Sequence, residues 1–205
     1  ADIDFNAASG HSVSYALRNL FHACAQDLRC SRAYPNLEQT FLTLVDQLNR
    51  QPVALTLTGP QSKQAVATRV DGNAFVTALV PLLARPYSGN SVRGTSIPKF
   101  IHAASRGDFA WAADSLSSDL ESSDGSAKGM YHSVLCVRQK SLQATPDQVL
   151  PPPYPQLVGL GVREGEAVNN VCKILQAELK PPFVYRNTDI PTLVLNGSYD
   201  PVTPQ

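Results

Sequence analysis

The chain has 205 residues, enough for one domain or for one domain with a small appendage. Its 17 basic and 17 acidic residues balance, so it lacks the basic surface of a nucleic-acid-binding protein. No stretch approaches the ~20 apolar residues of a membrane-spanning helix. The N-terminus, ADIDFNAASGHS, lacks the basic start and apolar block of a signal peptide, which says little, because a chain cut from a longer protein would lack one anyway.

Apolar spacing predicts two helices in the first quarter of the chain. From Ser12 to Ala25 apolar side chains recur at helical intervals, and Ser12 is placed as the N-cap. A second helix is expected from Asn36 to Asn49, with Pro35 suited to its first turn. Its apolar stripe consists of Leu37, Phe41, Leu44, Val45 and Leu48.

A hairpin and further helices are expected next. PVALTLTG and QAVATRVDG, near residues 53–70, predict two strands joined by a Gly-Pro loop. Helices are expected from about Asn73, in SIPKFIHAASRGD and in FAWAADSLSSDLES, with Gly107 between the last two. SSDGSAKG is expected to be flexible by composition, and the proline-rich stretch 143–155 to be a rigid extended connector. A last helix is expected over residues 164–179.

The end of the chain, IPTLVLNGSYDPVTPQ, predicts a short buried strand at residues 193–195 and then a turn that carries Asp200. Pro181 and Pro182 separate it from the preceding helix. A lone strand must pair with a sheet, because it cannot satisfy its own backbone hydrogen bonds. The rest of the chain offers no parallel neighbour. We therefore expect a mainly α fold with one β-hairpin, plus a terminal strand that belongs to a sheet.

The cysteines indicate the redox environment. None of the four forms a CxxC pair or lies at zinc-finger spacing from a histidine, which argues against a metal site. Of the three possible connectivities we favour Cys24 with Cys30 and Cys136 with Cys172. This pairing needs one short local loop and one longer bridge, which is the least coincidental arrangement of the four cysteines. Disulfides would place the protein in an oxidising compartment, secreted or periplasmic. The alternative is four buried free thiols in a cytosolic protein.

Asp200 is the candidate catalytic residue. Side chains at the carboxyl ends of parallel strands are where sheet-based enzymes place their chemistry. In that setting Asp200 would be the acid of a catalytic triad, accepting a hydrogen bond from a histidine and stabilising the imidazolium. The alternative is a turn aspartate ahead of a proline, without a catalytic role.

No nucleophile or base accompanies Asp200 in this sequence. SGHSVS, residues 9–14, nearly matches G-x-S-x-G, but Ser14 replaces the last glycine and no buried strand precedes it. Ser12 within it is therefore interpreted as a helix cap. Hydrolases of the relevant type run serine, acid, histidine, and every histidine here precedes the acid: His11, His22, His102 and His132.

Several of these motifs, in this order, carry a resemblance. They are ACAQDLRCSRAYPNLEQTFLTLVDQLNRQPV, VDGNAFVTALVPLL, IPKFIHAASRGD, YHSVLCV and IPTLVLNGSYDPVTP. Together they resemble the lid-containing, C-terminal part of secreted α/β-hydrolases of the tripeptidyl-aminopeptidase and proline-iminopeptidase-like group. The likeness covers the chain from about Tyr15 to Pro204.

The resemblance implies a helical lid over residues 1–185 and, over residues 186–205, the strand and acid loop of an α/β-hydrolase core. It implies a serine hydrolase without cofactor or metal, which acts on a peptide or ester substrate through an acyl-enzyme. Asp200 matches the catalytic acid of the family, and the serine and histidine would lie outside this chain. The chain alone is then expected to be inactive and to need the rest of the hydrolase core as its partner.

One departure from the family leaves the substrate class open. Many of its peptidases carry an acid just after the cysteine equivalent to Cys136, where a lid acid can hold the free amine of the substrate. Here Arg138 lies in that place, and a cation repels an ammonium. An exopeptidase that releases N-terminal residues or short peptides, an esterase-type hydrolase, a non-catalytic helical binding module and a structural helical domain are the alternatives. Substrate-binding residues are unassigned, because aromatics at helical spacing are more often core than pocket: Tyr87, Phe109, Trp111 and Tyr131.

Overall fold

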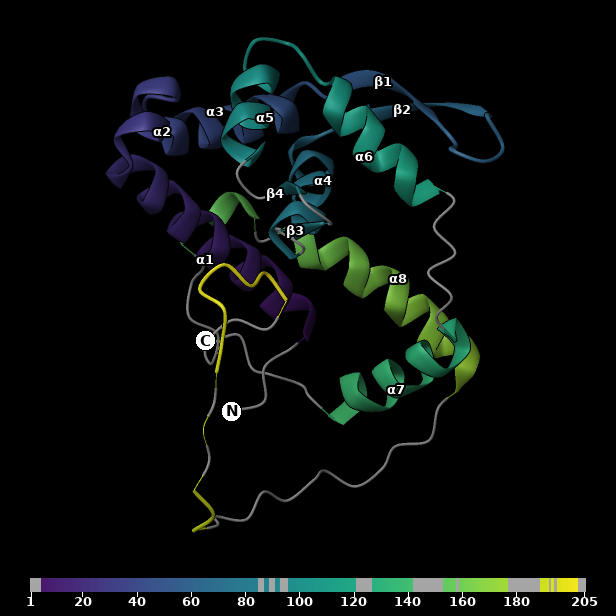
Figure 1. Ribbon diagram of the computed structural model, residues 1–205. Coiled ribbons are helices and arrows are strands. Elements are labelled where there is room, and N and C mark those ends of the chain that lie inside the picture. The colour runs from purple at the N-terminus through teal and green to yellow at the C-terminus, as the bar shows by residue number, and fades with distance from the viewer. Residues whose placement is uncertain are drawn as a thin grey trace.

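The computed structural model describes residues 5–84, 87–88, 91–92, 96–120, 127–141, 153–157, 159–176, 189–191, 193 and 195–202. Helices make up most of these residues, and one two-stranded antiparallel hairpin lies at the edge of the helical body (Figure 1). The predicted mainly α fold with one hairpin is therefore confirmed. A second antiparallel pair consists of strands of only two residues each.

The elements follow one another along the chain with short connections in the first half. The first half contains α1 (Phe5–Gln26), α2 (Leu28–Ala33), α3 (Leu37–Arg50), β1 (Val53–Thr58), β2 (Ala65–Val70), α4 (Gly72–Ala84), β3 (Tyr87–Ser88) and β4 (Ser91–Val92). The second half contains α5 (Ile97–Ala104), α6 (Ala110–Leu120), α7 (Lys128–Ser141), the 3-10 helix η3 (Pro155–Leu157) and α8 (Gly159–Leu175).

Helix α1 begins earlier than its apolar spacing predicts. Ser12, predicted as the N-cap, lies inside the helix and is only 3% exposed, so that prediction is wrong. Serine hydroxyls inside a helix can bond to a carbonyl of the preceding turn, as the Ser14 hydroxyl does by donating to the Gly10 carbonyl at 2.7 Å. The serines here therefore do not stop the helix.

Helix α3 and the hairpin agree with the sequence prediction. The five residues of the predicted stripe of α3 are all buried. Asn36 precedes the helix with a φ of 54°, in the left-handed region that asparagine tolerates. In the hairpin, β1 and β2 pair in antiparallel register, from Val53 opposite Val70 to Thr58 opposite Ala65.

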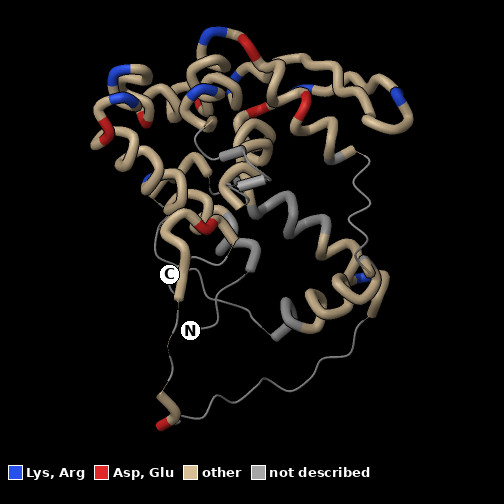
Figure 2. Tube along the Cα trace, in the orientation of Figure 1, with Lys and Arg blue, Asp and Glu red and all other residues tan. Residues whose placement is uncertain are grey.

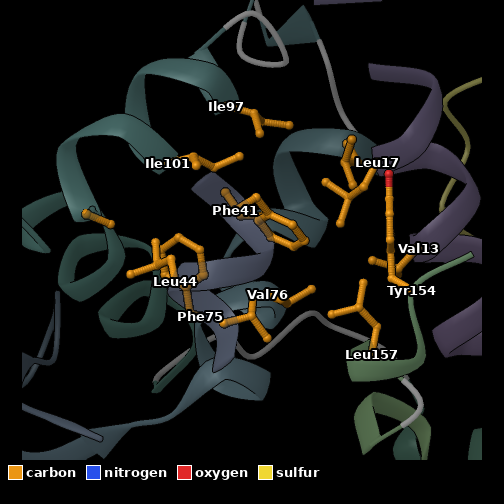
Figure 3. Packing of buried hydrophobic residues seen from close by; sticks show 14 of the residues in the cluster. Val13, Leu17, Phe41, Leu44, Phe75, Val76, Ile97, Ile101, Tyr154 and Leu157 are labelled. Atoms are coloured by element: carbon orange, nitrogen blue, oxygen red, sulfur yellow. The ribbon is translucent and has the colours of Figure 1, made fainter. Parts of the chain in front are cut away.

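The core lies between α1, α3, α4 and α5, with η3 and the start of α8 closing one side (Figure 3). Phe41 on α3 is at its centre, and the ring of Phe21 on α1 lies 5.2 Å from it. Helices α3 and α4 approach closely at Gly72, whose N–H donates to the Asn49 side chain at 3.0 Å. A Cβ at Gly72 would lie 2.6 Å from the Val45 carbonyl oxygen, so this contact needs a glycine.

The second half differs more from prediction. Helix α7 was not predicted, and α8 begins at Gly159, before the expected start at Glu164. The proline-rich connector and the end of the predicted last helix lie largely outside the described residues, as does most of SSDGSAKG.

Both predicted disulfides are present. Cys24 on α1 pairs with Cys30 on α2, with their Cα atoms 5.1 Å apart. Cys136 on α7 pairs with Cys172 on α8, with a Cα separation of 5.2 Å. All four cysteines of the chain are thereby paired, so the alternative of four thiols is wrong for this structure.

The predicted terminal strand is not formed by the described residues of its segment. Leu193 and Leu195 are in irregular backbone and are 81% and 82% exposed; Val194 lies outside the described residues. A strand needs a neighbour to accept and donate its backbone hydrogen bonds, and no strand lies beside this segment in the described residues.

Candidate functional site

Residues 196–202, here called the acid loop, hold Asp200 in a tight turn. The Asp200 N–H donates to the Gly197 carbonyl at 3.1 Å, which closes the turn. One carboxylate oxygen of Asp200 accepts from the Val202 N–H at 2.8 Å. Such a bond, from a side chain to the backbone two residues on, restricts the direction of the carboxylate.

The acid loop lies against helix α1 (Figure 1). The Asn19 side chain amide donates to the Ser198 carbonyl oxygen at 2.6 Å. Pro201, next to Asp200, is buried, whereas Tyr199 is 45% exposed. The loop therefore has an anchor on the helical body even though the described residues before it form no strand.

The histidines are spread over three helices. His11 and His22 lie on α1, His102 lies on α5 and His132 lies on α7. Burial lowers the pKa of His11 below its ordinary value. The rings of His102 and Tyr34 form a T-shaped pair with their centroids 5.6 Å apart. The Ser12 hydroxyl is enclosed in α1, where it cannot act as an exposed nucleophile, so the near match to G-x-S-x-G is not a nucleophile elbow.

A second candidate site is a pocket of about 530 Å³ between α1, α2 and the start of α3. Its lining combines apolar and polar side chains, among them Phe21, Leu37, Leu42, Tyr34, His22 and Glu38. The carboxylate of Glu38 accepts a hydrogen bond of 2.7 Å from the hydroxyl of Tyr154. This bond holds the carboxylate of Glu38, which lines the pocket together with apolar side chains.

Tyr154 belongs to the proline-rich connector, and sequence reasoning assigned it no role. It is 4% exposed, and its ring lies 6.1 Å from Phe21 and 6.4 Å from Phe41. Burial raises its pKa, and the hydrogen bond to Glu38 and the negative charge there raise it further. The sequence signal that could have identified Tyr154 is an aromatic residue isolated among prolines. Interpreting the stretch as a rigid connector did not take this residue into account.

The aromatic residues considered for a pocket mostly belong to the core. Phe109 is buried and forms a T-shaped pair with Phe75, and Trp111 stacks on Phe100 with ring centroids 4.5 Å apart. Tyr131 is 52% exposed on α7, and the side chain of Tyr87 lies outside the described residues.

Neither the distribution of charged residues nor the grouping of metal-ligating side chains indicates a further site in the described part of the chain. Figure 2 shows acidic and basic residues interspersed over the described chain. Within that part, no three His, Cys, Asp or Glu side chains gather as a metal site. None of the described helices combines the length and apolar character needed to cross a bilayer.

Comparison of the chain with protein-family models, with curated proteins and with solved structures finds no match. Its function therefore has to be inferred from its own motifs and geometry.

Proposed function

We propose that this chain forms the lid and acid loop of a secreted serine hydrolase, whose serine and histidine are supplied by a sheet domain outside these 205 residues. The ordered motifs that resemble the tripeptidyl-aminopeptidase and proline-iminopeptidase-like group support this assignment. The helical architecture and the two disulfides are compatible with a secreted lid domain.

The observation that carries the proposal is the exposed apolar segment before Asp200. Leu193 and Leu195 are 81% and 82% exposed. Each such side chain would gain about 1.5–3 kcal/mol from full burial. An apolar segment of strand length that leads into an acid-bearing turn fits a strand at the carboxyl edge of a parallel sheet. We therefore propose that strands of a hydrolase core pair with this segment and bury its leucines.

In this proposal Asp200 has the role of the orienting acid. Its carboxylate would accept the Nδ1–H of the histidine, fix the tautomer of the ring and stabilise the imidazolium that forms when the serine is deprotonated. The hydrogen bond from the Val202 N–H restricts the carboxylate before substrate binds. Such preorganisation suits a group that must stabilise charge as it develops.

The substrate class follows from the resemblance, which favours a peptidase that releases N-terminal residues or short peptides. Arg138 argues against amine recognition at the position where family peptidases carry an acid, which keeps an esterase-type reaction as the alternative. Both reactions pass through an acyl-enzyme.

The test compares two aspartates of the same local geometry in the full-length hydrolase. Asp108 also accepts from the backbone N–H two residues on, at 3.1 Å from Ala110, and is exposed. We expect Asp200→Asn to lower kcat/KM for aminoacyl-anilide and ester substrates by about 10³–10⁴-fold, because the histidine loses its acid partner. Asp108→Asn should leave turnover unchanged. Equal turnover in the two variants would reject the assignment of Asp200.

The pocket between α1, α2 and α3 favours a second candidate, a non-catalytic binding module. Its apolar lining residues and the carboxylate of Glu38 suit a small ligand with an apolar body and a hydrogen-bond donor. This candidate predicts that Asp200→Asn leaves the affinity for the ligand unchanged, whereas Glu38→Gln lowers it. Calorimetry measures both affinities.

A further inference from the structure

A side-chain hydrogen bond joins helix α1 to the acid loop. The Asn19 Nδ2 donates to the Ser198 carbonyl oxygen at 2.6 Å, across 179 positions of sequence. Asn19 is half-buried and Ser198 is exposed, so this bond lies at the border between the helical body and the surface.

Asn19 is held on a well-anchored part of α1. Its neighbours Leu17 and Phe21 are 0% and 2% exposed. Phe21 packs against Phe41 of α3 and against Tyr154, and the disulfide from Cys24 ties the end of α1 to α2. Because the helix is fixed on both sides of Asn19, the amide is a rigid donor.

Ser198 lies inside the turn that sets the direction of the Asp200 carboxylate. The turn is closed from Asp200 back to the Gly197 carbonyl, and the carboxylate accepts from Val202. A shift of the Ser198 carbonyl therefore moves the backbone between Gly197 and Asp200. The orientation of the carboxylate depends on the same few peptide units.

We infer that Asn19 is a positioning residue, which holds the acid loop on the lid so that Asp200 faces its histidine. This inference rests on the proposed function of Asp200. The hydrogen bond from Asn19 also couples the lid to the triad, because a displacement of α1 would move Asp200. A single hydrogen bond at this border contributes little to folding, whereas a displacement of about 1 Å at a reacting group can cost 10²-fold in rate.

The experiment uses three substitutions of Asn19 in the full-length hydrolase, with Asp200→Asn as reference. Asn19→Leu and Asn19→Asp remove the donor, and Asn19→Gln keeps one. We expect Leu and Asp to lower kcat by about 10–100-fold with KM changed less than ~3-fold, and Gln to retain most of the activity. Asn169→Leu, at an exposed position of α8, is the control and should leave kcat unchanged.

The pH profile separates positioning from general damage to the fold. A well-placed Asp200 favours the imidazolium and so raises the pKa of the histidine. When the acid is displaced, that pKa falls, and the acidic limb of the kcat/KM profile should move to lower pH in Asn19→Leu. If thermal unfolding shows that Asn19→Leu is not folded, Asn19→Asp replaces it in the comparison of kcat. Asn19→Gln remains the variant expected to retain activity.

The outcomes distinguish this inference from the proposal beneath it. If Asp200→Asn loses activity while Asn19→Leu keeps both kcat and the acidic limb, the positioning role is wrong and the hydrolase assignment stands. A loss of kcat without a moved limb and without rescue by Asn19→Gln indicates a structural role only, and also overturns it. If Asp200→Asn is fully active, the proposed function fails, and the inference fails with it.

Discussion

The hydrogen bond between Tyr154 and Glu38 shows how single residues connect distant parts of this chain. The tyrosine hydroxyl donates to the carboxylate at 2.7 Å, across 116 positions of sequence. We expect Tyr154→Phe to lower the free energy of unfolding by about 1–2 kcal/mol, because the partly buried Glu38 loses its donor. Urea denaturation at pH 7 measures this change. Tyr131→Phe is the control, since Tyr131 is exposed on α7, and should change stability by less than about 0.5 kcal/mol.

The same contact predicts a pH dependence. The pKa of Tyr154 is raised above the usual 10.0, so the folded protein keeps this proton at pH values where the unfolded chain loses it. The contribution of the protonated Tyr154 hydroxyl to the free energy of unfolding is therefore complete below pH 10 and is lost as the pH rises above 10. We expect the stability of the wild type to fall above pH 10 more steeply than that of Tyr154→Phe. Equal slopes for the two proteins would contradict the raised pKa.

At the scale of elements, the two disulfides join neighbouring helices but close loops of different size. Their sequence separations are 6 for Cys24–Cys30 and 36 for Cys136–Cys172. The chain-entropy model gives about 2 and about 4 kcal/mol of stabilisation for loops of these lengths. We expect the double alanine variant at residues 136 and 172 to lose more stability in urea than the one at residues 24 and 30. The reverse order would show that native packing, not loop closure, dominates.

Periodicity predicted the elements whose apolar side chains all face the core. Helix α3 is the clearest example, since its stripe from Leu37 to Leu48 is buried along its whole length. Helix α7 has no such stripe: Cys136 is fully buried, whereas Met130 and Val134 are 69% and 60% exposed. Its apolar residues do not mark one buried face, so the sequence pattern did not identify it as a helix.

At the scale of the whole molecule, the apolar segment before the acid loop lacks a cover among the described residues. In the 205-residue chain we expect Leu195→Ser to change the free energy of unfolding by less than about 0.5 kcal/mol, because Leu195 is 82% exposed. In the full-length hydrolase the same change should cost about 3 kcal/mol, because the proposed sheet buries that side chain. Denaturation curves of both proteins test this difference.

Leu157→Ser provides the control for that comparison. Leu157 is 0% exposed, so its substitution should destabilise both proteins by about 3 kcal/mol or more. A small effect of Leu195→Ser in the full-length protein as well would mean that no sheet covers the segment, and would count against the hydrolase core.

The amino-acid sequence by itself determined the features that depend on neighbouring residues. These are the helical stripe of α3, the hairpin of β1 and β2, and the turn that presents Asp200, because periodicity and turn chemistry act over a few positions. The disulfide partners also followed from spacing along the chain.

Only the tertiary structure decided the contacts between residues far apart in sequence. Tyr154 meets Glu38 because the segment at η3 packs against α1 and α3, and Asn19 meets Ser198 because the acid loop lies against α1. No local pattern encodes such a meeting. For the same reason the sequence predicted the turn that carries Asp200 but could not say what holds that turn in place. The apolar segment before that acid shows the limit of local pattern, since a strand forms only where a neighbouring strand accepts its hydrogen bonds.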